Sequence, residues 1–259
     1  MTHGSLDGAV AKIGRARNQA SALEKEITTE WPPDEPWPVT RKVNGSGLEH
    51  RLYLGDLPPI KPDWALVAGE ILFDARSALD HLAYELHVRH FRGNVPGGVE
   101  GTTQFPIYEH ERGWGLNSYR IRSLSVRDRR ALKNLQPYVS RNDALRWTRF
   151  WLSRLSTWHN ADKHRKLHLV TAAQHFTAVP EFPAEYGFRH DPRLGAVESG
   201  AHIATWTFTK PPPEIAPEVG AFLDVSLEYR DDIVILSFAL FQIITYTGAV
   251  LDRFAGHFQ

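Results

Sequence analysis

The sequence predicts an α+β protein that is mainly helical, with a bundle of about four long helices and a small antiparallel β-sheet. Three observations lead to this prediction. Long stretches carry apolar residues at helical intervals, segments after residue 166 alternate apolar and polar residues, and Gly- and Pro-rich stretches separate the two kinds. With 42% hydrophobic and 23% charged residues among 259, we expect one domain, residues 1–259.

The first expected elements are a helix, a hairpin and a second helix. Helical periodicity covers residues 5–31, and the four prolines of WPPDEPWP end that helix. An Asn-Gly pair and a further Gly lie between alternating segments over residues 39–54, which predicts a β-hairpin. The second helix is expected over residues 64–90, with Asp63 as its N-cap.

Three more helices are expected over residues 124–136, 142–165 and 233–255. The last contains 19 consecutive uncharged residues, and the polar side chains scattered through it favour a buried central helix over a membrane span. Alternating segments predict β-strands over residues 167–178, 201–210 and 222–229.

Composition excludes several classes of site. The chain has no cysteine, so disulfides, thiolate metal sites and a cysteine nucleophile are ruled out. Phosphate-loop, dinucleotide-binding, serine-elbow and His-Glu-x-x-His motifs are also missing from the sequence. The first residues lack the charged start and apolar run of a secretory signal, so we expect a cytoplasmic protein with no membrane contact.

Charge is concentrated in the middle of the chain. Residues 112–166 contain 14 Lys and Arg against three acids, although the whole chain has no net charge. This indicates an anionic partner such as RNA or contact between oppositely charged subunits, and the equal alternative is that the arginines are spread on several solvated helix faces. The candidate phosphate-binding residues are Arg127, Arg129, Arg130, Arg146 and Arg149.

The segment GEILFDARSALDHLAYELHVRH, residues 69–90, carries an unusual number of charges for a helix with an apolar face. On a helical projection Glu70, Asp74, Ser77, His81 and Glu85 form one polar stripe opposite the apolar residues. Arg76 lies off this stripe, spaced for an ion pair with Asp80. The stripe is either a solvated face or part of a functional site.

The RSALDH segment resembles the R-x(4–6)-H signature of HEPN-superfamily ribonucleases, helical bundles of bacterial toxin and phage-defence systems. In that family the Arg and His of two subunits meet and cleave RNA without a metal. The resemblance implies that Arg76 holds the scissile phosphate, that His81 transfers a proton, and that Ser77 and Asp80 support them. It also implies a homodimer without a cofactor.

A second resemblance covers more of the chain. The segments RSALDHLAYEL, TQFPIY, LQPY and NADKHR, in this order, are similar to a set found in uncharacterised bacterial proteins. This likeness implies no function.

The segment WHNADKHRK suggests an alternative site. His159 and Asp162 both project onto the apolar stripe of their helix. Together with Glu70, Asp74 and His81 they are candidate ligands of a divalent metal in a helical bundle. Otherwise Asp162 braces the helix end and His159 is hydrogen-bonded in the core. A ribonuclease or RNA-binding protein is therefore the first hypothesis, a metal-dependent enzyme the second and a non-enzymatic interaction protein the third.

Overall fold

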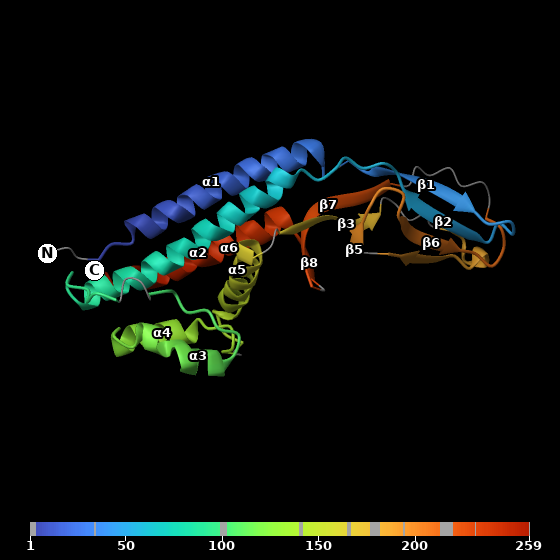
Figure 1. Cartoon of the computed structure of the whole chain (residues 1–259). Coiled ribbons are helices and arrows are strands. Elements are labelled where there is room, and N and C mark those ends of the chain that lie inside the picture. Colours follow the sequence, from blue (N-terminus) through green and yellow to red (C-terminus); the bar gives the residue numbers. More distant parts are fainter. Residues whose placement is uncertain are drawn as a thin grey trace. The chain divides into compact units, whose positions relative to one another are not determined.

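The computed structural model describes residues 4–33, 35–98, 103–139, 142–164, 167–176, 182–193, 195–212, 220–230 and 232–258. In these residues the chain forms six α-helices and an eight-stranded antiparallel sheet (Figure 1). It divides into a helical unit, residues 1–22, 65–167 and 238–259, and a sheet unit, residues 23–64 and 168–237. The single domain expected from the sequence stays a prediction, since helices α1, α2 and α6 each continue from one unit into the other.

Five of the six α-helices lie close to their expected positions, and α3 was not expected from the sequence. The six are α1 (Asp7–Glu30), α2 (Pro62–His90), α3 (Glu111–Asn117), α4 (Val126–Asn134), α5 (Arg146–His164) and α6 (Leu236–Ala255), with a 3₁₀ turn η1 (Ser118–Ile121) after α3. The apolar arc of α2 is fully buried, as expected; it comprises Ile71, Leu72, Ala75, Ala78, Leu79, Leu82, Ala83 and Leu86. This arc forms much of the core of the helical unit.

The polar stripe of α2 faces α1, which runs beside it in the opposite direction (Figure 1). Asp74 is buried and forms a two-pronged ion pair with Arg15. One turn earlier, Glu70 accepts a hydrogen bond of 3.2 Å from Gln19. Part of the stripe therefore joins the two helices through Asp74 and Glu70, although the Glu70 and His81 side chains are still exposed.

Helix α6 differs from the buried central helix that its apolar sequence suggested. It begins at Leu236, because the preceding residues form strand β8 (Asp232–Ile235). One face is buried around Ile243 and Phe254, whereas Phe238 and Phe241 are exposed on the opposite face. No helix within the described ranges has the length and apolar character needed to cross a membrane.

The sheet unit contains β1 (Trp37–Val43), β2 (Glu49–Leu54), β3 (His168–Phe176), β4 (Arg189–Pro192), β5 (Gly195–Val197), β6 (His202–Thr207), β7 (Gly220–Tyr229) and β8. The strand order is β4-β6-β2-β1-β7-β3-β5, and β8 also pairs with β7. All these pairings are antiparallel, and β1 and β2 form the expected hairpin. A 3₁₀ turn η2 (Ala184–Tyr186) precedes β4.

The expected fold class, a four-helix bundle with a small sheet, is therefore wrong. Strands β4, β5 and β8 were missed because they have only 4, 3 and 4 residues, too few to show an alternating pattern. Pairing with longer neighbours, rather than their own periodicity, makes these segments strands.

Candidate functional site

A polar pocket of about 180 Å³, here called the Arg76 pocket, lies inside the helical unit. Its lining comes from α2, the segment 104–108, η1 and α5. The charged and polar side chains that line it are Arg76, Asp80, Gln104, Tyr108, Arg120, Ser156, His159, Asn160 and Lys163. Convergence of several polar groups in one pocket is typical of a ligand-binding site.

Arg76 and Asp80 form the ion pair that their spacing predicted, with 3.0 Å between Nη2 and Oδ1. The pair also holds the backbone of Phe105. Arg76 Nη2 donates to the Phe105 carbonyl at 2.7 Å, and the Phe105 N–H donates to Asp80 Oδ1 at 2.8 Å. The segment 104–108, which forms one wall of the pocket, is thus hydrogen-bonded to α2 through Phe105, although this segment is not part of the sheet.

Gln136 holds the next residues of this wall from the other side. Its amide nitrogen donates to the Pro106 carbonyl at 2.9 Å, and its amide oxygen accepts from the Tyr108 N–H at 3.1 Å. Gln136 is fully buried, so each of these bonds replaces one that water would otherwise provide. The four segments RSALDHLAYEL, TQFPIY, LQPY and NADKHR therefore all meet at this pocket.

The pocket has an excess of positive charge. Arg76, Arg120 and Lys163 line it from α2, η1 and α5, and Asp80 is the acidic residue in the lining. Arg120 donates to Gln104 Oε1 at 2.7 Å, which fixes part of its guanidinium. Cations from three elements around one cavity favour an anionic ligand.

His159 is the buried group at this pocket, with only 4% of its surface exposed. Its Nε2 has no hydrogen-bonding partner within the described residues. Burial lowers the pKa of His159 to about 4, and Lys163 and Arg76 act in the same direction. The imidazole is therefore neutral at pH 7. An unpaired buried nitrogen is costly, which favours a partner from a ligand.

Tyr108 lines the same pocket and stays protonated. Burial raises the pKa of its phenol, and the nearby Arg120 and Arg76 only partly oppose this effect. A protonated phenol can donate a hydrogen bond to a ligand oxygen.

The structure brings together some of the predicted site residues and separates others. Arg76 and Asp80 line the pocket, whereas Ser77 and His81 do not. His81 is exposed beside α1, where a Cβ on Gly8 would lie 3.1 Å from its Nδ1. Five residues along a helix turn a side chain by roughly 140°, so Arg76 and His81 project to different faces. His159, from another helix, supplies the imidazole beside Arg76.

The alternative metal ligands lie on different interfaces. Glu70 and Asp74 contact α1, whereas His159 and Asp162 lie on α5. The Asp162 carboxylate packs against α2, where a Cβ on Gly69 would lie 2.6 Å from Oδ1, and burial raises its pKa. In the part of the chain that the structure describes, no three His, Asp or Glu side chains are grouped as metal ligands.

The predicted phosphate-binding arginines have different environments. Arg149 is only 3% exposed, and it bonds to Asp143 and to the Asn134 carbonyl. Asp143 and that carbonyl thus bind its guanidinium in the interior, so Arg149 is not presented on the surface. Arg146 lies over the Trp147 ring at 5.1 Å, and Trp147 is exposed. Arg127 and Arg130 line a second pocket.

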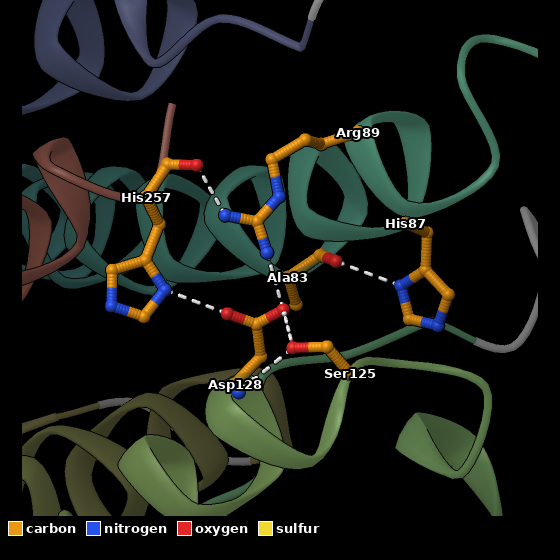
Figure 2. Close-up of polar contacts among 6 residues, drawn as sticks. All are labelled: Ala83, His87, Arg89, Ser125, Asp128 and His257. Carbon is orange, nitrogen blue, oxygen red and sulfur yellow. Dashed lines mark hydrogen bonds and ion pairs between the residues drawn. The ribbon is translucent and has the colours of Figure 1, made fainter. Parts of the chain in front are cut away.

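A buried ionic cluster, here called the Asp128 cluster, was not foreseen (Figure 2). The Asp128 carboxylate is fully buried and accepts hydrogen bonds from Arg89, from the Ser125 hydroxyl at 2.6 Å and from His257 Nδ1 at 2.6 Å. Burial alone would raise the pKa of Asp128, but Ser125, His257 and Arg89 together hold it below its usual value. Arg89 and His257 are too far from Asp128 in sequence for a local pattern to reveal them, since only Ser125 lies within one helical turn of it.

Neither family models, nor curated proteins, nor solved structures give a match to this chain. Function must therefore be argued from the chemistry of the site rather than from relatives.

Proposed function

We propose that this protein binds RNA, that the Arg76 pocket holds one phosphate group, and that the strand is cleaved there without a metal ion. One observation carries the proposal: Arg76, Arg120 and Lys163 line a pocket around a buried imidazole whose Nε2 has no partner among the described residues. Fixed cations and one central hydrogen-bonding group are what a phosphate group requires.

The size of the pocket supports a phosphate within a longer molecule. A volume of about 180 Å³ is smaller than the ~300 Å³ at which sites for whole small molecules begin. A backbone phosphate needs little space because its neighbours lie outside the pocket. The surrounding surface would then carry the rest of the strand.

Exposed aromatic rings with arginine partners support single-stranded RNA. Tyr119 is exposed and lies under the Arg120 guanidinium at 5.8 Å, directly beside the pocket. Trp147 and Arg146 form a similar exposed pair on α5. Such rings stack on unpaired bases while the cations follow the phosphates.

The pocket also contains groups suited to strand cleavage by the 2′-hydroxyl. Cleavage would require His159 Nε2 to take the proton of the 2′-hydroxyl, whose oxygen then bonds to phosphorus as the bond to the 5′-oxygen breaks. The Tyr108 phenol would donate a proton to that leaving oxygen. Arg76 would stabilise the charge that develops on the phosphate, the role that the HEPN resemblance implies. A homodimer, a cytoplasmic location and a toxin or defence role remain predictions.

Binding is tested with a fluorescent single-stranded RNA by anisotropy at several salt concentrations. We expect Arg120→Gln and Lys163→Gln each to weaken binding and to reduce the salt slope by about 1. Arg17→Gln is the matched control, because Arg17 is exposed on α1 and lies outside the pocket. Equal affinities in all four proteins would refute the proposal.

Cleavage is tested on the same RNA with EDTA present. We expect His159→Gln to slow cleavage by about 10²-fold or more, the usual scale for loss of a general base. His81→Gln should cleave normally, since His81 lies outside the pocket lining. Normal cleavage by His159→Gln and slow cleavage by His81→Gln would favour Arg76 and His81 acting across a dimer. If the wild-type protein cleaves no RNA, the cleavage part of the proposal is refuted and only the RNA-binding part remains.

A non-enzymatic interaction protein is the second candidate. The observation that favours it is the set of hydrogen bonds among Arg76, Asp80 and the backbone of Phe105. In this set both charged side chains already have partners within the protein. On this reading, variants of the pocket change stability only. Unfolding curves collected beside the RNA assays separate the two candidates.

A further inference from the structure

A second pocket in the helical unit lies between α4 and the C-terminal end of α6 with the residues that follow it. It has a volume of about 520 Å³ and is lined by Val126, Arg127, Arg130, Asn134, Arg253 and His257, with Ala131. Three arginines and no acidic residue contribute to this lining. We call it the His257 pocket.

The arginines of this pocket are not neutralised by the protein. Arg127, Arg130 and Arg253 are exposed, and none forms an ion pair with any residue that the structure describes. Three neighbouring cations without counter-charge repel one another, so an anion between them is favourable.

His257 is the buried group of the pocket, with 9% of its side chain exposed. Asp128 accepts from its Nδ1 at 2.6 Å, and Arg89 donates to its backbone carbonyl. Figure 2 shows the other ring nitrogen on the side of the ring away from Asp128. The ring and the backbone of His257 are therefore each held by one hydrogen bond.

The partner also fixes the tautomer of His257. An ionised carboxylate can only accept hydrogen bonds, so the Nδ1 atom of His257 must carry the proton. The hydrogen bonds that keep the pKa of Asp128 low keep this carboxylate ionised. Nε2 is then an acceptor in the neutral ring and a donor in the protonated ring.

We propose that the His257 pocket is a second anion site, which binds a phosphate monoester through Arg127, Arg130, Arg253 and His257. A monoester carries close to two negative charges and three acceptor oxygens at pH 7, which suits three guanidinium groups and one imidazole. The pocket is also wide enough for a nucleoside attached to the phosphate. The proposal holds whether or not the Arg76 pocket binds RNA.

The first test is titration of the full chain with adenosine 5′-monophosphate. Binding is monitored by the NMR signals of ¹⁵N-labelled imidazole rings and by calorimetry. We expect saturable binding that shifts the His257 signals, and affinities roughly tenfold weaker, ~1.4 kcal/mol, in Arg130→Gln and Arg253→Gln. Both arginines are exposed, so these variants should fold, and Arg17→Gln is again the control. Absence of saturable binding, or an equal effect in Arg17→Gln, overturns the proposal.

The second test identifies the source of the phosphate. Two RNA strands of one sequence, one with a 5′-phosphate and one with a 5′-hydroxyl, are compared. A preference for the phosphorylated strand that is lost in Arg130→Gln but kept in Arg120→Gln supports an RNA end as ligand. Saturable nucleotide binding without any strand preference supports a free nucleotide. If neither response is seen, the His257 pocket is not an anion site. Loss of binding to the 5′-hydroxyl strand in Arg120→Gln would concern only the Arg76 pocket.

Discussion

The Arg76 pocket and the Asp128 cluster are built from the same three residue types with opposite results. Each has an arginine of α2 paired with an aspartate, and each has a histidine from another segment. In the cluster His257 is bonded to Asp128, whereas His159 in the pocket has a buried nitrogen without a partner in the described residues. Asp80 bonds to backbone and to Arg76 instead. The number of satisfied hydrogen bonds, rather than residue type, separates the two aspartate–arginine pairs: Asp128 bonds to the histidine beside it, whereas Asp80 leaves the His159 nitrogen open to a ligand.

The largest expected effect comes from breaking the cluster. Asp128→Asn removes a buried negative charge that faces Arg89 and His257. We expect a loss of about 3–5 kcal/mol in the free energy of unfolding, because the cations lose their partner in a buried environment. Urea denaturation measures this. Asp252→Asn, at an exposed position of α6, should change stability by less than ~0.5 kcal/mol.

A pH series tests the neutral state of His159. Its pKa falls from an ordinary 6.5 to about 4 on folding, so between these values the unfolded chain binds the proton and the folded chain does not. Stability therefore falls as pH drops through this range, by about 2 kcal/mol at pH 5 relative to pH 7.5.

His159→Leu is the comparison for this series, because leucine does not titrate. Urea unfolding at pH 7.5 and pH 5 should show a smaller loss in the variant than in wild type. Three other histidines, His50, His87 and His190, also have lowered pKa values and titrate in both proteins. An identical loss in both proteins would show that His159 is charged in the folded state.

A smaller effect is expected at Ser125. This residue is the N-cap of α4, and its hydroxyl accepts from the Asp128 N–H at 3.1 Å while donating to the Asp128 carboxylate. Ser125→Ala should cost about 1–2 kcal/mol, measured as a lowered Tm and urea midpoint. Ser125→Thr keeps the hydroxyl and should recover most of this loss. A full loss in the threonine variant would mean that packing, rather than capping, matters here.

The smallest stability effect is expected at Asp80, where the two regions differ most. Asp80→Asn keeps the oxygen that accepts from Phe105 but removes the one negative charge of the Arg76 pocket lining. Stability should change by less than ~1 kcal/mol, because the ion pair with Arg76 is partly exposed. RNA affinity should rise several-fold at low salt. Weaker RNA binding in this variant would contradict an anion site in the pocket.

Local patterns were sufficient for most helices and for the first hairpin. Helix α2 was predicted as residues 64–90 and is found at Pro62–His90, because its fully buried arc repeats at 3.6 residues. The ion pair of Arg76 and Asp80 was also predictable, since it needs only one turn of one helix. The inward position of His159 followed from the same periodicity.

Distant pairing decided the rest. Short strands such as β5 exist because neighbouring strands satisfy their backbone, and the sequence of three residues cannot show this. The partner of His257 lies 129 residues away, and His159 reaches the Arg76 pocket from another helix.

The sequence by itself determined which helix faces are apolar and which residue types are available, without cysteine and with a basic middle. Only the tertiary structure decided that the polar stripe of α2 faces α1, that Arg149 is buried, and that His159 rather than His81 lies beside Arg76. The physical reason is that periodicity fixes the direction of a side chain on its own helix. What that side chain meets depends on packing between segments far apart in the chain.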